Sequence, residues 1–103
     1  MRKITQNTIN AFLNDNPIKE SNTEVILNAN FGNPYTELYL FGNLIAQKQI
    51  GGKKITITNA GWKSNTTKER LNALPNVRIQ QKKGDWFLNG QKWDGDWMTI
   101  QTN

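Results

Sequence analysis

The spacing of apolar residues changes along the chain, and this change predicts the secondary structure. Residues 5–13 place three apolar side chains on one helical face: Ile9, Phe12 and Leu13. Thr5 fits the N-cap of this helix, and the sequence Asn-Asp-Asn-Pro at residues 14–17 ends it, because proline cannot continue a helix. The pattern predicts an N-terminal helix that packs on a sheet.

A two-residue period, typical of strands, begins at Thr23. It predicts strands at residues 24–28, 36–41, 44–50 and 53–58. Gly42-Asn43 and Gly51-Gly52 fit short hairpin turns, and a longer loop is expected at Asn30-Phe31-Gly32-Asn33-Pro34. In this register Glu37 lies opposite Lys48 as a surface pair. One face should form core, and it carries Tyr39, Phe41, Leu44, Ala46, Ile55 and Ile57.

A second, shorter helix is predicted after the strand pattern breaks at residues 59–63. The segment Thr-Thr-Lys-Glu matches a capping box, with Thr66 as N-cap and Glu69 three residues later. The helix runs to about Leu74 and stops before a proline. Leu71 and Leu74 should point inward.

Glycine-containing turn pairs divide the C-terminal part of the chain. They predict strands at residues 76–83, 85–88, 91–93 and 96–101, around Gly84-Asp85, Asn89-Gly90 and Asp94-Gly95. If each turn holds two residues, Lys83 meets Trp86 and Trp86 meets Trp93. On the next row, four side chains line up across the four strands: Lys82, Phe87, Lys92 and Trp97.

Side-chain alternation gives this second meander two different faces. The apolar face should be core and carries Val77, Ile79, Trp86, Leu88, Trp93, Met98 and Ile100. The opposite face carries Arg78, Gln80, Lys82, Phe87, Lys92, Trp97, Thr99 and Gln101. If Asp94-Gly95 belongs to a wider loop, Trp97 changes face.

Together these elements predict a single α+β domain over residues 1–103. Two antiparallel β-meanders form one bent sheet or a small barrel, with an N-terminal helix and a short central helix. A chain of 103 residues has room for one modest core.

Positive charge is concentrated in the second half of the chain. The net charge is +5 overall; residues 1–45 contribute 3 − 4 = −1, and residues 46–103 contribute 10 − 4 = +6. All four tryptophans also lie in the second half. A basic field interleaved with aromatic rings favours a binding protein, with nucleic acid as the first candidate partner.

The chain lacks the residues on which most enzymes depend. It contains no histidine and no cysteine, so the commonest general base, nucleophile and zinc ligands are missing. We therefore expect no enzyme, no cofactor and no metal site; Asp94 and Asp96 fit a turn better than a metal site. No apolar run reaches membrane-spanning length and no signal peptide is evident, so we expect a cytoplasmic protein in contact with no membrane.

Two sets of residues are candidates for binding a partner. The first would bind nucleic acid or another partner: Arg78, Lys82, Phe87, Lys92 and Trp97. The alternative is that Phe87 and Trp97 pack under the N-terminal helix or the first sheet. The second set would contact phosphate at a helix N-terminus: Lys63, Thr66, Thr67, Lys68 and Arg70. An ordinary capping box with a solvated face is the favoured interpretation of this second set.

Three segments of the chain resemble one known family. They are residues 59–74 (Asn-Ala-Gly-Trp-Lys-Ser-Asn-Thr-Thr-Lys-Glu-Arg-Leu-Asn-Ala-Leu), residues 80–90 (Gln-Gln-Lys-Lys-Gly-Asp-Trp-Phe-Leu-Asn-Gly) and residues 93–95 (Trp-Asp-Gly). They look like a family of short bacteriophage and prophage proteins with no assigned activity, and the resemblance extends weakly into residues 38–46. It implies a small phage gene product that acts inside a bacterial host cell, and it carries over no catalytic residues.

These observations lead to three functional hypotheses. The first is a small basic phage accessory protein that binds nucleic acid, single strands or RNA in particular, through an aromatic and basic sheet face. The second is a phage inhibitor that binds a host protein or nucleoprotein involved in defence or host takeover, since tryptophan and arginine concentrate at protein interfaces. The third is a virion or structural accessory protein.

Overall fold

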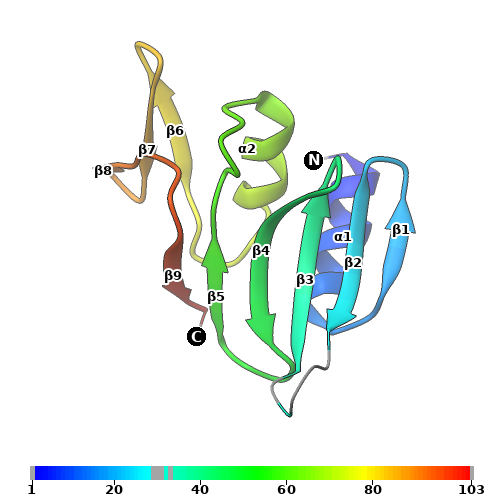
Figure 1. The fold of residues 1–103 in the computed structure, drawn as a ribbon. Helices are drawn as coiled ribbons and strands as arrows, with labels where there is room; N and C mark the ends of the chain where they lie inside the picture. The colour runs from blue at the N-terminus through cyan, green and yellow to red at the C-terminus, as the bar shows by residue number, and fades with distance from the viewer. Residues whose placement is uncertain (1, 29–31, 33, 103) are drawn as a thin grey trace.

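A computed structural model describes residues 2–28, 32 and 34–102 of the chain. Within these residues it contains two helices and nine strands, and the strands form two antiparallel sheets of six and three strands (Figure 1). This confirms the predicted α+β class. The meanders form neither one bent sheet nor a barrel, because they separate into two sheets. The predicted loop at residues 30–34 lies largely outside the described residues.

Helix α1 (Lys3–Leu13) covers one face of the larger sheet. Ile9 and Phe12 are buried as predicted, and Leu13 is half-buried against the core. The N-cap is Arg2, three residues before the predicted N-cap Thr5, so that assignment was wrong. Thr5 is instead fully buried, and its hydroxyl donates to Glu69 Oε1 at 2.7 Å.

The larger sheet has the strand order β1-β2-β3-β4-β5-β9, with every neighbouring pair antiparallel. Its strands are β1 (Ile18–Glu20), β2 (Thr23–Asn28), β3 (Tyr35–Leu40), β4 (Asn43–Gln49), β5 (Lys54–Ile57) and β9 (Met98–Gln101). Strands β2 to β5 confirm the four predicted strands to within two residues at each end. The three-residue strand β1 was not predicted, because it is too short to show a period.

The β3–β4 hairpin differs from the prediction by one residue. Its turn is Phe41-Gly42, with φ of 51° and 78°, and a bulge follows in which Leu38 pairs with Ala46 but Tyr39 pairs with Leu44. A one-residue shift exchanges the two faces of a strand. The predicted core assignment was therefore wrong for three residues: Tyr39 and Leu44 are half-buried, and Phe41 is 68% exposed. It was right for Ala46, Ile55 and Ile57. The predicted Glu37–Lys48 pair was also wrong, because Glu37 pairs with Gln47.

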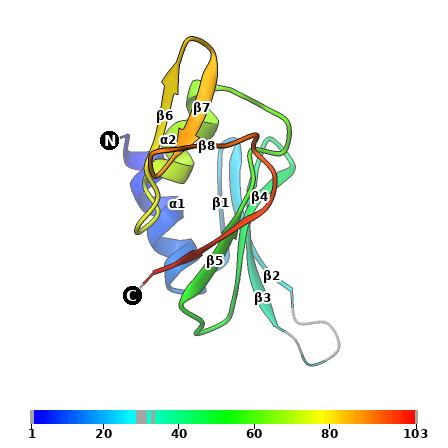
Figure 2. The same cartoon turned by 90° about the vertical axis from the view of Figure 1, so that its left-hand side faces the viewer.

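Helix α2 (Asn65–Asn72) lies on the same face of the larger sheet as α1 (Figure 2). Its N-cap is Ser64, whose Oγ accepts a hydrogen bond from Thr67 N at 3.1 Å. The helix thus begins before the predicted capping box, and Thr66 is not its N-cap. Leu71 and Leu74 are buried, as predicted.

The smaller sheet consists of β6 (Ile79–Lys82), β7 (Asp85–Leu88) and β8 (Gln91–Lys92). The predicted Asn89-Gly90 turn is confirmed, but the first turn is Lys83-Gly84 rather than Gly84-Asp85. Trp86 is therefore opposite Gln81 and not Lys83. The predicted contact between Trp86 and Trp93 is present, with ring centroids 6.3 Å apart.

Asp94-Gly95 does not form the predicted hairpin, because the chain crosses there from the smaller sheet to the larger one. The Gly95 carbonyl accepts hydrogen bonds from Asn59 N at 3.0 Å and from Thr58 Oγ1 at 2.6 Å. Gly95 has a φ of 92°, and a Cβ there would lie 2.1 Å from Asn59 Nδ2, so only glycine permits this approach. Strand β9 consequently pairs with β5. Met98 is 43% exposed rather than core.

Candidate binding surfaces

The outer face of the smaller sheet brings together four of the five residues in the first predicted set. We call Arg78, Lys82, Phe87 and Lys92 the basic face. Phe87 pairs with Gln80 on one side and Lys92 on the other. Trp86 and Leu88 are buried on the inner side, whereas Phe87 is half-buried and the three cations are exposed. Side-chain alternation therefore puts Lys82 and Lys92 on the same face as the Phe87 ring, with Arg78 directly before β6.

The charge of this region is largely uncompensated. Residues 78–92 hold Arg78, Lys82, Lys83 and Lys92 against Asp85, so their net charge is 4 − 1 = +3. Lys92 Nζ lies 3.7 Å from Asp85 Oδ2, but the two side chains are 71% and 50% exposed, and such pairs contribute little. The side chains of Arg78 and Lys82 form no ion pair with any residue that the structure describes.

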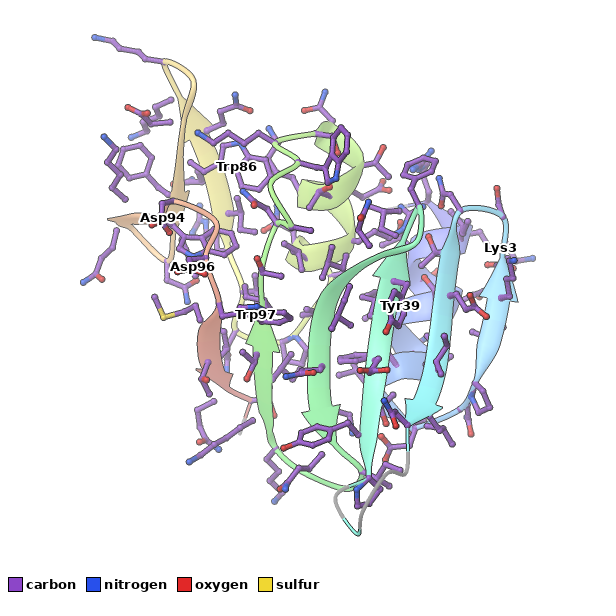
Figure 3. The ribbon with its side chains drawn as sticks, in the orientation of Figure 1. Lys3, Tyr39, Trp86, Asp94, Asp96 and Trp97 are labelled. Atoms are coloured by element: carbon purple, nitrogen blue, oxygen red, sulfur yellow. The ribbon has the colours of Figure 1, made fainter. Side chains whose placement is uncertain are left out.

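Trp97, the fifth residue of that set, lies outside the basic face. Met98 pairs with Ile57 at the end of β5, and Trp97 precedes it in the crossing segment (Figure 3). The predicted row of four side chains across four strands was therefore wrong at Trp97, because a wider loop replaces the hairpin. It was also wrong at Lys82, which pairs with Asp85, whereas Phe87 pairs with Gln80 and Lys92. Trp97 is 45% exposed and Phe87 half-buried, so neither ring is buried as the alternative interpretation required.

The residues of the second predicted set do not converge on one point. Lys63 is exposed in the loop before α2, and Thr66 is half-buried. Thr67 is buried, with its backbone N–H bonded to the helix cap. The Nζ of Lys68 donates to Gln81 Oε1 at 2.7 Å and lies 5.9 Å from the centroid of the Trp86 ring. Arg70 has no exposed surface at all and cannot contact a phosphate in this structure.

Arg70 belongs to a buried network that joins both helices to the first hairpin. Its Nη1 donates to Thr5 Oγ1 at 2.5 Å and to Glu69 Oε1 at 2.6 Å. Its Nε donates to Thr23 Oγ1 at 3.1 Å. The hydrogen bond from the Thr5 hydroxyl is the main cause that lowers the pKa of Glu69 below its ordinary value, and Arg2 and Arg70 add to it. No local pattern of residues indicates this network, because its members are up to 65 residues apart.

A second buried cation, Lys48, lies at the other end of α1. Its Nζ is 2.6 Å from Asp15 Oδ1, and the side chain of Lys48 is only 4% exposed. The Thr36 hydroxyl and the Gly51 N–H also donate to Asp15, at 2.5 and 3.0 Å. Burial raises the pKa of Asp15, but these hydrogen bonds together outweigh burial and leave the pKa below its ordinary value. Both buried cations are therefore part of the fold and not of a binding surface.

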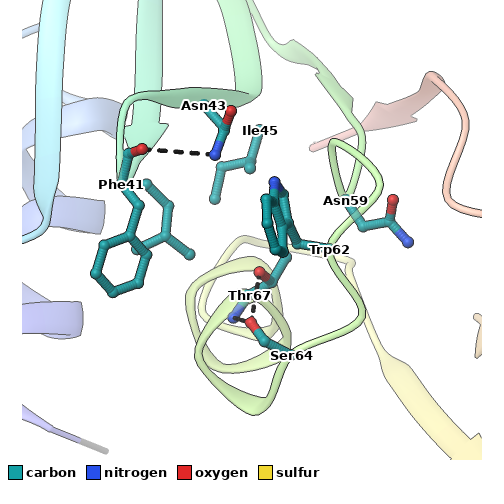
Figure 4. Close-up of a pocket in the computed structure, with 8 residues that line it drawn as sticks. Phe41, Asn43, Ile45, Asn59, Trp62, Ser64 and Thr67 are labelled. Carbon is teal, nitrogen blue, oxygen red and sulfur yellow. Dashed lines mark hydrogen bonds between the residues drawn. The ribbon is translucent and has the colours of Figure 1, made fainter.

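An apolar pocket opens between the β3–β4 turn and the start of α2 (Figure 4). We call it the aromatic pocket; its volume is about 310 Å³, and it is lined by Leu40, Phe41, Asn43, Ile45, Asn59, Trp62, Ser64 and Thr67. Phe41 and Trp62 are 68% and 61% exposed, the highest values among the large apolar residues that the structure describes. Sequence reasoning assigned Phe41 to the core and missed this pocket.

The family model of the Kyanoviridae Gp96 protein matches residues 1–102. The chain belongs to this family. Gp96 is a family of phage proteins, which confirms the expectation of a phage protein and extends the match to nearly the whole chain. No curated protein and no solved structure matches the chain.

Membership of the Gp96 family gives the chain a viral context but no reaction and no ligand. In the part of the chain that the structure describes, neither helix is long and apolar enough to cross a membrane.

Proposed function

We propose that this Gp96 protein binds nucleic acid through the basic face of its smaller sheet. The observation that carries the proposal is the net charge of +3 on residues 78–92, held on exposed side chains around the half-buried ring of Phe87. Arg78, Lys82 and Lys92 would contact phosphates, and Phe87 would stack on a base. Single strands and RNA loops are the favoured ligands, because their bases are free to stack.

The cations of the basic face, unlike the two buried cations Arg70 and Lys48, are exposed to solvent, and this supports a role in binding phosphate. A phosphate contact requires a cation that reaches solvent and that is not already neutralised by a carboxylate. Arg78 and Lys82 meet both conditions, whereas Arg70 and Lys48 meet neither. The absence of Trp97 from this face reduces the expected stacking to one ring, so electrostatics should dominate the affinity.

The test is a fluorescence-anisotropy titration of labelled single-stranded RNA, single-stranded DNA and duplex DNA at several salt concentrations. We expect affinity for single strands to fall with salt, with a log–log slope of about −0.7 for each phosphate contacted. The variant with Lys82→Gln and Lys92→Gln should lose about two such contacts. Its slope should become shallower by about 1.4.

Two further variants distinguish a specific face from general positive charge. Phe87→Ala should weaken binding to single strands by roughly 1–3 kcal/mol if the ring stacks on a base. Lys3→Gln, at the opposite edge of the molecule in Figure 3, should change affinity far less. Equal losses from Lys3→Gln and Lys82→Gln would contradict the proposal, because any cation would then serve.

The same face would also suit an acidic host protein, which is the second candidate function. An inhibitor of a host protein or nucleoprotein should form a stoichiometric complex that survives nuclease treatment and is weakened by the Lys82 and Lys92 substitutions. Absence of nucleic-acid binding at low salt, together with such a complex, would replace the first proposal with this one. Concentration-dependent self-association without either partner would instead favour a virion or structural accessory role.

A further inference from the structure

We propose that the aromatic pocket receives one large apolar side chain from a partner protein, presented by a segment with acidic residues on either side. This is a second binding site, separate from the basic face, since the two share no residue. The pocket proposal can therefore be tested independently of nucleic-acid binding. Four observations, on size, lining, backbone conformation and charge, lead to this occupant.

The size of the pocket suits a single anchor. Ligand pockets range over about 300–1,000 Å³, and the aromatic pocket, at about 310 Å³, is near the lower limit. Leu40 and Ile45 are buried beneath it, while Phe41 and Trp62 rise at its edge from two separate loops (Figure 4). An aromatic or branched apolar side chain would fill this space and leave little room for a longer ligand.

Several polar groups in the lining are already engaged within the protein, and Asn43 Nδ2 donates to Phe41 O at 3.5 Å. Ser64 Oγ accepts from Thr67 N and lies 2.9 Å from Thr67 Oγ1. Asn59 Oδ1 accepts from Gly61 N at 2.8 Å. A nucleobase carries several donors and acceptors on its edge that would need partners here. Because these lining groups are spent on the protein's own loops, an apolar occupant fits better than a base.

The conformation of Phe41 indicates a role outside the fold. Three two-residue turns share nearly the same φ at their first position: 51° at Phe41, 52° at Lys83 and 51° at Asn89. Asparagine is the preferred residue there, and a bulky side chain at positive φ is a rare and costly choice. Burial does not offset this cost at Phe41, which is 68% exposed. Such residues often mark functional sites, and the ring at the pocket edge would gain its packing from a partner.

The charge near the pocket determines what should flank the anchor. None of the residues that line the pocket is acidic. Lys63 is exposed and directly follows Trp62. The whole chain carries +5. Acidic residues beside the anchor would accelerate association with this surface and favour it over basic or neutral partners.

The experiment uses a blocked peptide with the sequence Glu-Asp-Trp-Asp-Glu, titrated into the ¹⁵N-labelled full chain. The readouts are the indole N–H of Trp62 and the amide of Gly42. We expect saturable shifts at both, and affinity at least tenfold weaker for Glu-Asp-Ala-Asp-Glu and for Lys-Lys-Trp-Lys-Lys. No saturable shift up to millimolar peptide would overturn the proposal. A stronger response of Trp62 to adenosine or cytidine monophosphate would also overturn it, in favour of a base site.

Substitutions at the pocket edge separate binding from stability. Trp62→Ala should weaken binding of the acidic peptide about tenfold or more, because tryptophans at an interface are among the residues whose truncation costs the most binding energy. Phe41→Asn should weaken it similarly in a protein with an unchanged or higher melting temperature, because asparagine suits the turn. Trp97→Ala removes an exposed tryptophan outside the pocket and should leave the affinity unchanged. Unchanged affinity in both pocket variants would overturn the proposal.

Discussion

The two buried cations and the cations of the basic face have the same charge but opposite roles. Arg70 and Lys48 lie inside the region built from α1, α2 and the larger sheet. Arg70 contacts Glu69 and Thr5, and Lys48 contacts Asp15, which also accepts a hydrogen bond from Thr36. Arg78 and Lys82 extend from the smaller sheet into solvent. A charge count includes all four equally. Only their burial distinguishes the charge that holds the fold together from the charge that a partner can reach.

The difference has a physical origin in desolvation. A cation removed from water is tolerated when a counter-ion and hydrogen-bond acceptors replace its hydration shell. Thr5 and Thr23 supply hydroxyl acceptors for Arg70, and Asp15 supplies the charge for Lys48. The smaller sheet offers no such enclosure to its outer face, so its cations keep their water until a partner displaces it.

The largest effect should come from removing the buried guanidinium. Arg70→Met would remove the donor to the Thr5 and Thr23 hydroxyls and one of the two cations beside Glu69, which keeps its pair with Arg2; loss of hydrogen bonds to a charged group costs about 1.5–3 kcal/mol. The free energy of unfolding, measured by urea denaturation, should fall by about that much. Arg78→Met, the matched control on the basic face, should change it by less than about 0.5 kcal/mol. Equal effects at the two arginines would remove the distinction between the regions.

Acid should lower the stability of the region that holds the two buried cations, by protonating the carboxylates Asp15 and Glu69. The folded pKa values of Asp15 and Glu69 lie below their ordinary values of 3.8 and 4.5. Their contribution is complete above those ordinary values and is lost as the pH falls through the lower folded values. The urea midpoint should therefore drop below about pH 4.5. In the variant with Asp15→Asn and Glu69→Gln, the midpoint at neutral pH should be lower and the fall with acid smaller. An identical acid dependence in wild type and variant would count against this assignment.

The smallest effect on stability is expected at the basic face itself. Lys82→Gln and Lys92→Gln together remove one exposed ion pair, that of Lys92 with Asp85, and exposed pairs contribute about 0–1 kcal/mol. The melting temperature should therefore stay close to that of wild type, even though the salt dependence of nucleic-acid binding changes. A large drop in melting temperature would show that these lysines belong to the fold, and would place them with Arg70 and Lys48.

The sequence-based predictions were correct where a feature depends on residues close together in the chain, and less accurate where it depends on distant residues. Ile9, Phe12, Leu71 and Leu74 were correctly placed as buried, because helical spacing is a local property. The Asn89-Gly90 turn was correct for the same reason. The turns predicted at Gly42-Asn43 and Gly84-Asp85 were wrong by one residue, since Phe41 and Lys83 occupy first turn positions at which asparagine or glycine is expected. At the β3–β4 hairpin that shift moved Phe41 from the predicted core to the edge of a pocket.

The candidate sites show the same division. Arg78, Lys82, Phe87 and Lys92 could be placed on one face from the sequence, because the alternation of side chains is local and moving a turn by one residue changes the register by two. Trp97 could not be placed, because its position depends on Gly95 packing against Asn59, which is 36 residues away. The aromatic pocket is formed by two loops distant in the sequence, and no local pattern indicated that Phe41 and Trp62 would meet.

By itself, the sequence determined the α+β class, most of the strands, the concentration of positive charge in the second half and the resemblance to a phage family. These depend on composition and short-range periodicity, which are properties of the sequence and do not require tertiary contacts. The tertiary structure decided which cations are buried, that β9 joins β5, and that two exposed rings frame one pocket. Those outcomes depend on contacts between distant segments, whose energies no local pattern of residues encodes.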